Sequence, residues 1–318
     1  MNRKEQVKKA IYQKGPDYVP ILFFNGDRET SDVILIDVVR HFMGEDKDVS
    51  EWGFQWERQD GTMGQPKQEV IRDWSSYSGL KAPDAYDKAR FGDVKKTMEQ
   101  FGERYYVASL VLTGFTIMTF LRGFANTLED FFENPEEIAG LADAVFGFEE
   151  DIIRQLKGYS FDAVAFYDDW GTQSNLIISP KMWREFFKPR YKRQFDLAHK
   201  YGLDVYFHCC GYIYEIIPDL IEIGVDMLNL SQPNLFDIEK LGKDFGGKVC
   251  FVCPVSYQTT AISGTKEDIY AEAGKLIENL GRFRGGLIGY VEEYPSIGMP
   301  DENYRSCINA FQELGRYK

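Results

Sequence analysis

Apolar segments of strand length alternate with amphipathic segments of helix length along the second half of the chain. The strand-like segments are rich in β-branched and aromatic residues, and each one precedes a helix-like segment. Strands that alternate with helices at this spacing predict parallel pairing through right-handed crossovers. The predicted strands cover 161–169, 204–210, 227–232, 248–255 and 286–293, and the helices lie at about 180–200, 213–223, 236–244, 265–281 and 301–315.

The first half of the chain is less regular. Its pattern predicts strands at 19–24 and 105–112 and helices at 3–14, 29–43, 87–101 and 116–146. Residues 45–80 make an irregular excursion rich in Gly, Trp and charge, with a hairpin, and long excursions of this kind are typical of a lid or a pocket wall.

A total of about eight strands in 318 residues predicts one (β/α)8 TIM barrel domain over 1–318. An open doubly wound sheet is the alternative, but no Gly-rich dinucleotide fingerprint follows the first strand.

The charge balance limits the partners. Acidic residues outnumber basic ones 50 to 37, the net charge is −13, and the Lys and Arg are scattered among acids. We therefore expect neither nucleic acid nor an anionic membrane as a partner.

The N-terminal stretch MNRKEQVKKAIYQKG lacks an apolar core, and no run approaches the roughly 18 apolar residues of a membrane span, so we expect a cytoplasmic protein. Five cysteines in 318 residues indicate reduced thiols or metal ligands, not a disulfide framework.

The stretch YGLDVYFHCCGY carries the candidate chemistry. Because side chains alternate along a strand, His208 and Cys210 point together and Cys209 points away. An imidazole and a thiolate at a strand end supply half of a tetrahedral zinc site. A structural interpretation is equally open at this stage, since free cysteines are usually buried and a lone histidine often satisfies a core hydrogen bond.

The active site of a barrel lies at the C-terminal ends of its strands. Polar residues gather there in this sequence, and among them we assign substrate contacts to Asn25 and Gln232 and further contacts to the aromatic residues Tyr167, Trp170 and Tyr206. The polar residues at predicted strand ends are Asn25, Asp27, Asp168, Asp169, His208, Cys210, Gln232, Cys253, Glu292 and Glu293.

Four stretches of this chain resemble the uroporphyrinogen decarboxylase superfamily. They are YDDWGTQSNLIISPKMWREFFKPRYKR, YFHCCGYIYEIIPDLIEIGVDMLNLSQP, LGKDFGGKVCFVCPV and GGLIGYVEEYPSIGMPDEN. Within the superfamily they look most like the zinc- and corrinoid-dependent methyltransferases, including the methylcobalamin:coenzyme M enzymes and the demethylating methyltransferases of anaerobes. The decarboxylases carry Arg-Gln-Ala-Gly-Arg after the first strand, where this chain reads FFNGDRETSD, so decarboxylation of uroporphyrinogen is not expected.

The resemblance implies a ligand set. The methyltransferase branch binds zinc through a His-x-Cys pair, matched by His208 and Cys210, and through a second cysteine near the last strand, where this chain has Glu293. Glutamate is a competent zinc ligand, which leaves a His/Cys/Glu site with one open position. Cys253 stays open as a further ligand or a wall of the pocket, although Cys250, three residues before it, faces the other way on a regular strand.

The resemblance also implies a reaction. A zinc ion would act as a Lewis acid on a thiol acceptor or on the oxygen of a methylated substrate, while the corrinoid sits on a separate protein, since this chain has no Asp-x-His-x-x-Gly motif. Asp168 and Asp169 are the candidates for a general acid or for contacts to the corrinoid, or one of them caps the next turn. The aromatic residues at the predicted strand ends, among them Tyr167, Trp170 and Tyr206, favour an aryl methyl ether as the substrate. The alternative is a lyase acting on a different carboxylic acid, and a homodimer is left open.

Overall fold

The computed structural model describes residues 2–24, 27–39, 48–57, 64–292 and 297–317. Eight parallel strands close into a barrel in the order β1-β10-β9-β8-β7-β6-β5-β2, as the alternation of strands and helices predicts. The barrel strands are β1 (Ile21–Phe24), β2 (Val33–Asp37), β5 (Tyr105–Ser109), β6 (Ala163–Tyr167), β7 (Asp204–Cys209), β8 (Met227–Leu230), β9 (Cys250–Cys253) and β10 (Leu287–Glu292).

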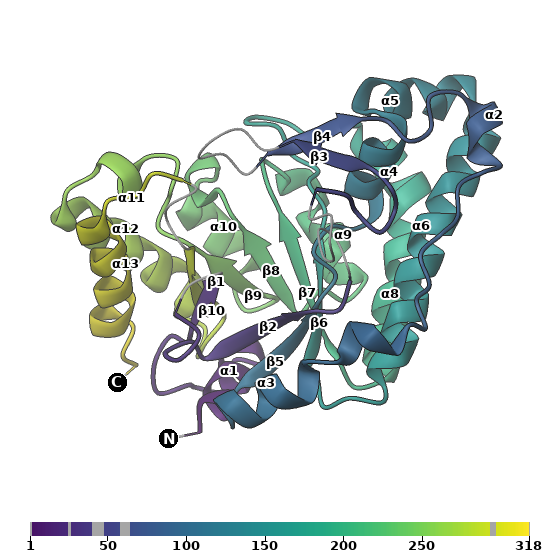
Figure 1. The fold of residues 1–318 in the computed structure, drawn as a ribbon. Helices are drawn as coiled ribbons and strands as arrows, with labels where there is room; N and C mark the ends of the chain where they lie inside the picture. The colour runs from purple at the N-terminus through teal and green to yellow at the C-terminus, as the bar shows by residue number, and fades with distance from the viewer. Residues whose placement is uncertain (1, 25–26, 40–47, 58–63, 293–296, 318) are drawn as a thin grey trace.

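Helices surround the barrel and fill the connections between its strands (Figure 1). The α-helices are α1 (Arg3–Ile11), α2 (Trp74–Tyr77), α3 (Val94–Phe101), α4 (Gly114–Arg122), α5 (Phe124–Glu133), α6 (Pro135–Leu156), α7 (Pro180–Met182), α8 (Lys188–Lys200), α9 (Ile217–Glu222), α10 (Ile238–Phe245), α11 (Thr260–Ser263), α12 (Lys266–Leu276) and α13 (Asp301–Leu314). The short 3-10 helices are η1 (Lys88–Phe91), η3 (Tyr214–Ile216) and η4 (Pro233–Leu235). The π-helical turns are η2 (Trp183–Phe187) and η5 (Ile277–Gly281).

The prediction of a helix over residues 29–43 is wrong. Residues Val33–Asp37 form strand β2, which pairs with β5 over five residue pairs from Val33↔Tyr105 to Asp37↔Ser109. The run VILIDVV is rich in β-branched residues, whose stiff side chains favour a strand, and it supplies the barrel strand that this part of the chain otherwise lacks. Residues 40–43 of the predicted helix lie outside the described part of the chain.

The strands separate two apolar cores. One core lies inside the barrel and includes Tyr105, Tyr206 and Tyr290, while their neighbours along the strands pack outward against the helices. Helix α1 closes the N-terminal end of the barrel, because Val7, Ala10 and Ile11 pack into the inner core. The pairing of β1 with β2 is sparse, since only Leu22↔Val33 is paired among the described residues.

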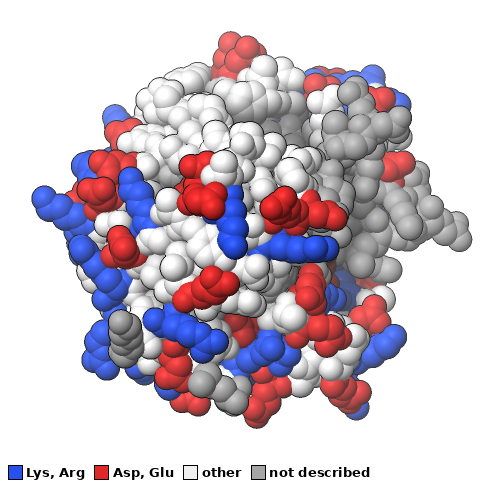
Figure 2. All heavy atoms as spheres, turned by 90° about the vertical axis from the view of Figure 1, so that its left-hand side faces the viewer, with Lys and Arg blue, Asp and Glu red and all other residues white. Residues whose placement is uncertain are grey.

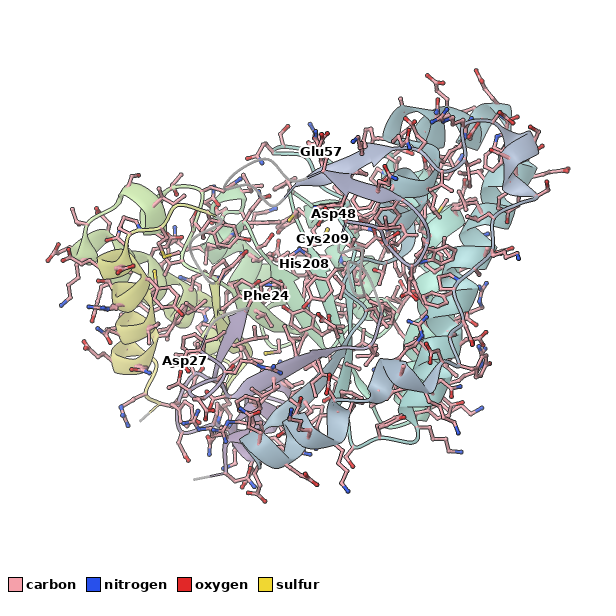
Figure 3. All side chains as sticks on the ribbon, in the orientation of Figure 1. Phe24, Asp27, Asp48, Glu57, His208 and Cys209 are labelled. Carbon is pink, nitrogen blue, oxygen red and sulfur yellow. The ribbon has the colours of Figure 1, made fainter. Side chains whose placement is uncertain are left out.

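The opposite end of the barrel is its mouth. Strands β3 (Gln55–Glu57) and β4 (Gln65–Gln68) form the antiparallel hairpin expected within the excursion, and this hairpin lies above the C-terminal ends of β7 and β8 (Figure 1). Trp56 from β3 packs against Phe120 of α4 with ring centroids 5.6 Å apart, which ties the hairpin to the wall of the barrel. Figure 3 accordingly shows Glu57 and Asp48 above His208 and Cys209.

The surface agrees with the mixed charge pattern of the sequence. On the face that carries α11, α12 and α13, acidic and basic side chains intermingle over the lower half, and the described side chains there form no basic stripe (Figure 2). In the described portion of the chain, every helix is too short or too polar to reach across a lipid bilayer.

Candidate metal centre at the barrel mouth

His208 and Cys210 approach each other at the end of β7. His208 is an inward residue of the strand, and Cys210 follows the strand end, so that His208 Nε2 lies 3.6 Å from Cys210 Sγ. Cys209 between them is buried in the outer core and accepts a hydrogen bond from the Trp170 amide at 3.2 Å. The alternation of the strand therefore gives the two side chains the common direction that the sequence predicts.

Asn229 on β8 fixes the orientation of the His208 ring. The Asn229 side-chain NH2 donates to the carbonyl of Val252 at 2.7 Å, so its oxygen faces His208 Nδ1 at 2.6 Å. An amide oxygen can only accept, and Nδ1 must therefore carry the proton. Nε2 is left with its lone pair directed toward Cys210, which is the arrangement that a metal-bound histidine needs.

Asp169 supplies a third donor atom. Its carboxylate oxygen Oδ1 lies 3.7 Å from His208 Nε2, and Asp169, His208 and Cys210 each offer a ligand atom, with all three atoms within 4.8 Å of one another. The same oxygen accepts a hydrogen bond from the Cys210 amide at 2.8 Å. The loop after β6 is therefore attached to the loop after β7 at the residues that carry the donors.

These donors fit a zinc ion. Imidazole nitrogen, thiolate sulfur and carboxylate oxygen are all zinc ligands, and bonds of about 2.0–2.3 Å at tetrahedral angles place two ligand atoms about 3.5 Å apart. The separations of 3.6 and 3.7 Å from His208 Nε2 match that spacing. Burial, with the nearby Asp169 charge, raises the pKa of the Cys210 thiol, and Ser231 Oγ lies 3.1 Å from its sulfur. A bound cation would deprotonate this thiol.

Asp168 lies behind the donors and not among them. Its side chain is fully buried and accepts hydrogen bonds from the amides of Phe115 and Thr116, each at 2.8 Å, and from the Tyr191 hydroxyl. Burial raises its pKa to about 7. Asp168 thus holds the first turn of α4, which differs from the catalytic position expected of it, because strand alternation turns the first Asp of the pair outward and leaves Asp169 at the mouth.

Glu149 on α6 forms the second half of this support. Its carboxyl group accepts from the Gly114 amide at 2.7 Å and from the Gln194 side-chain NH2 at 2.6 Å. Burial, the dominant cause, raises the pKa of Glu149 to about 8, and the nearby Asp168 adds to the shift. The N-terminus of α4 is therefore bound by two buried acids, neither of which reaches the donors.

The other predicted residues fall in different places. Gln232 accepts a hydrogen bond from the Gly211 amide at 2.7 Å and so supports the loop that carries Cys210. Trp170 is fully buried, stacked on Phe115, and does not line the mouth. Cys253 is buried in the outer core, where burial raises its pKa to about 12, so it lies on the other side of the sheet from His208. Asn25 and Glu293 lie outside the described residues.

Tyr167 and Tyr206 point into the barrel. The Tyr167 ring lies 5.0 Å from the His208 ring and 6.0 Å from the Tyr206 ring, between centroids. Tyr167 also lines a cavity of about 600 Å³ whose wall includes Phe24, Asp37 and Ser109. Figure 3 shows Phe24 below His208 on this side of the mouth.

Sequence reasoning missed two supporting residues, Asn229 and Ser231, and undervalued Glu292. Asn229 and Ser231 are inward positions on or just beyond β8, and Glu292 is the inward residue at the end of β10, where burial raises its pKa to about 7. Parallel barrel strands are usually apolar on both faces, so polar residues two apart in MLNLSQ are a signal that could have found them.

The comparisons with known proteins agree with this architecture. The uroporphyrinogen decarboxylase of Chlorobium phaeovibrioides is 24% identical over 257 residues, which cover 77% of this chain and 67% of that protein. A methyltransferase from Methanosarcina mazei superposes with a TM-score of 0.72 at 14% identity, with 99% of both chains covered, which shows a shared fold. The family model described as uroporphyrinogen decarboxylase (URO-D) matches residues 51–310. This match extends over most of the chain, and the protein belongs to the uroporphyrinogen decarboxylase family.

Proposed function

We propose that this protein moves a methyl group between a small methylated compound and the cobalt of a separate corrinoid protein, with a zinc ion at His208, Cys210 and Asp169. One observation carries the proposal. The Asn229 side-chain oxygen accepts a hydrogen bond from His208 Nδ1–H and leaves Nε2 facing Cys210 Sγ at 3.6 Å and Asp169 Oδ1 at 3.7 Å. A histidine that merely satisfied a core hydrogen bond would not need a thiol and a carboxylate on its other nitrogen.

The family and the fold support an enzyme of this class. The uroporphyrinogen decarboxylase family model matches residues 51–310, and the Methanosarcina mazei protein that superposes on 99% of this chain is called a methyltransferase. A bound zinc ion has no redox chemistry and would supply Lewis acidity toward an oxygen or sulfur atom of the substrate. Methyl transfer from or to such an atom is a reaction that uses this property.

The side chains around the donors have distinct tasks. Asn229 holds the imidazole, and Ser231 is placed to donate to the Cys210 sulfur once the thiol has lost its proton. Asp169 brings a negative charge to the open side of the site, since its side chain is half exposed. Asp168 is a positioning residue, because it fixes α4 and the strand end from which Asp169 projects.

A pair of variants distinguishes the two candidates for the third protein ligand, Asp169 and Glu293. The resemblance assigns Glu293 to this role, whereas the described donor atoms put Asp169 beside His208. We propose Asp169 as a ligand and keep Glu293 as a prediction. Loss of zinc from Asp169→Asn but not from Glu293→Gln would assign the ligand to Asp169, and the reverse result would assign it to Glu293.

Metal analysis of the purified protein tests the centre. We expect one zinc per chain, lost in His208→Ala and in Cys210→Ser. The matched control is Cys209→Ala, which removes the adjacent thiol that faces the outer core. Equal zinc content in the natural protein and the three variants would show that zinc does not bind at His208 and Cys210.

Spectroscopy of cobalt tests the reaction. The zinc-loaded protein is mixed with cob(I)alamin and a panel of methyl ethers, methanol, methylamines and methylated sulfur compounds, and in the reverse direction with methylcobalamin and thiols. We expect the absorption spectrum of cobalt to report gain or loss of the methyl group, and Cys210→Ser to abolish the change. A zinc-loaded protein that changes neither spectrum would refute the methyltransferase proposal.

A further inference from the structure

A cavity of about 600 Å³ reaches from the candidate metal centre toward helix α3. Its inner part is lined by Phe24, Asp37, Ser109 and Tyr167, and its outer part by Arg28, Asp93 and Lys96. The Tyr167 ring contacts His208, with 5.0 Å between ring centroids, so the inner end of the cavity adjoins the donors. A small molecule in the cavity would therefore contact Tyr167, the residue that separates the cavity from His208.

The inner end of the cavity is negatively charged. Asp37 is the last residue of β2 and an inward position that is exposed at the barrel mouth; partial desolvation raises its pKa against the opposing effects of a hydrogen bond from Ser109 and the charge of Arg28. No ion pair within 4.0 Å joins Asp37 to any described Lys or Arg; Arg28 instead donates to the Leu35 carbonyl at 3.0 Å and lies over the Phe101 ring. Among the described residues Asp37 therefore has no Lys or Arg as an ion-pair partner, so a cationic ligand would supply the compensating charge.

Glu292 adds a second carboxylate at the end of β10, which is separated from β2 by β1 alone. It is paired in register with Phe24, and both are inward residues at the ends of their strands. Its charge acts on Tyr167, Tyr206 and Tyr290, which shows that it faces the same aromatic ring of residues. Among the described residues Glu292 likewise has no ion pair within 4.0 Å.

Aromatic rings surround these carboxylates. Phe24 stacks on Tyr290 at 5.9 Å between centroids and lies 6.3 Å from Tyr167, which in turn lies 6.0 Å from Tyr206. Tyr167 lines the cavity and is 8% exposed, while its hydroxyl is buried without a hydrogen bond of good geometry among the described residues, with Ser109 beside it. The fully buried Tyr206 hydroxyl is also unpartnered in the described part of the chain.

We propose that this cavity binds the positively charged centre of a methylated onium compound, an ammonium or a sulfonium. The negative faces of aromatic rings attract such cations, whose methyl groups prevent strong hydrogen bonding, and a neighbouring carboxylate adds a direct charge interaction. Phe24 and Tyr167 supply the rings, and Asp37 supplies the charge. The inference rests on the proposed function for the use made of the ligand and names the class of methyl donor.

The cations in the outer part of the cavity do not reverse this preference. Lys96 and Asp93 lie on the surface near the start of α3, where their opposite charges compensate, and the Arg28 side chain is held by Leu35 and Phe101. An anionic substrate would have to bind beside the Asp37 carboxylate, where Arg28, engaged by Leu35 and Phe101, is the described cation that acts on it. The inner end therefore selects positive charge.

Calorimetric titration of the full chain tests the preference for positive charge. The probes are choline, its sulfonium analogue (2-hydroxyethyl)dimethylsulfonium, and the neutral isostere 3,3-dimethylbutan-1-ol. We expect at least one onium probe to bind about tenfold more tightly than the alcohol, and the difference between the two onium probes identifies the heteroatom. Equal or tighter binding of the alcohol would overturn the inference.

Variants test the location. Asp37→Asn should weaken the binding of the preferred onium probe about fivefold or more, whereas the matched control Asp93→Asn at the outer end should leave it within about twofold. Circular dichroism verifies that both variants are folded. Benzoate binding that exceeds onium binding and falls in Arg28→Gln would show that the cavity recognises anions and would refute the inference.

The two proposals fail separately. Tight onium binding by a protein that never changes the cobalt spectrum would support the onium site and refute the proposed methyl transfer. Methyl transfer from a neutral ether, with no binding of either onium probe, would uphold the reaction and remove the onium site.

Discussion

Gly171 and Gly211 lie back to back where the loops after β6 and β7 cross. A Cβ atom added to Gly211 would lie 2.0 Å from the Gly171 carbonyl oxygen, and one added to Gly171 would lie 2.4 Å from the Gly211 carbonyl carbon. The Gly171 amide also donates to the Cys210 carbonyl at 3.1 Å. The close contact of these two glycines brings Asp169 and Cys210 into the same centre.

Substitution Gly211→Ala should disrupt the metal centre. The new methyl group overlaps backbone, which cannot move aside as a flexible side chain would, and the φ of +79° adds strain of about 1–2 kcal/mol. Zinc content and the free energy of unfolding should both fall. Gly202→Ala is the matched control, because Gly202 has a φ of +75° and open space around its Cα. Equal zinc content in the two variants would contradict a role for the crossing.

Substitution Asn229→Ala should weaken zinc binding about 10–100-fold, since the His208 ring loses the acceptor that fixes its tautomer and orientation. Competition with a chelating dye measures the affinity. Asn229→Asp keeps an oxygen acceptor toward Nδ1 and should restore part of the affinity. If alanine and aspartate variants bind zinc as tightly as the natural protein, Asn229 does not orient the ligand.

Stability should depend on pH through Glu149. Its pKa is about 8 in the folded protein against an ordinary value of 4.5, so the folded state holds a proton that the unfolded state has lost between these values. This contribution to stability is complete at low pH and is lost as the pH rises to about 8, at up to about 1.4 kcal/mol per pH unit. Chemical denaturation between pH 5 and 8 should show a shallower decline for Glu149→Gln. The exposed Glu136→Gln on the same helix should behave like the natural protein, and parallel curves for all three would contradict the buried proton.

Uroporphyrinogen should not be decarboxylated by this protein. That substrate carries many carboxylates, whereas the strand ends at the mouth carry Asp37 and Glu292, and Arg28 is engaged by Leu35 and Phe101. Porphyrin formation from uroporphyrinogen, followed by fluorescence after oxidation, measures the activity. Product formed at enzyme-like rates would contradict the prediction.

The barrel could be predicted because its signal is repeated. Each strand from 161 onward has a following helix, and the repetition tolerates errors in single elements. The same approach gave a helix over residues 29–43, because a buried apolar run on both faces resembles the apolar side of a helix. Whether residues 33–37 form a strand or a helix is decided by their pairing with β5, which lies some 70 residues away along the chain.

For the site, the sequence predicts which side chains of one strand point the same way, but not which side chains of different strands contact each other. Alternation within β7 placed His208 with Cys210, since both residues belong to one strand and its extension. The roles of Asp168 and Asp169 could not be separated, because they depend on where β6 ends and on the amides of α4. Asn229 could not be connected to His208 by any local rule, since that contact depends on the register of β7 and β8.

The sparse pairing of β1 with β2, which is limited to Leu22↔Val33 in the described ranges, has a kinetic consequence. The cavity runs from Tyr167 inside the barrel to Asp93 and Lys96 of the α3 side, next to these loosely joined strands. A protein partner seated on the mouth would leave this lateral passage uncovered, while α1 blocks the far end. A small compound could then exchange while the partner stays attached, so initial-rate measurements should show random order of addition and no requirement that the larger partner depart between turnovers.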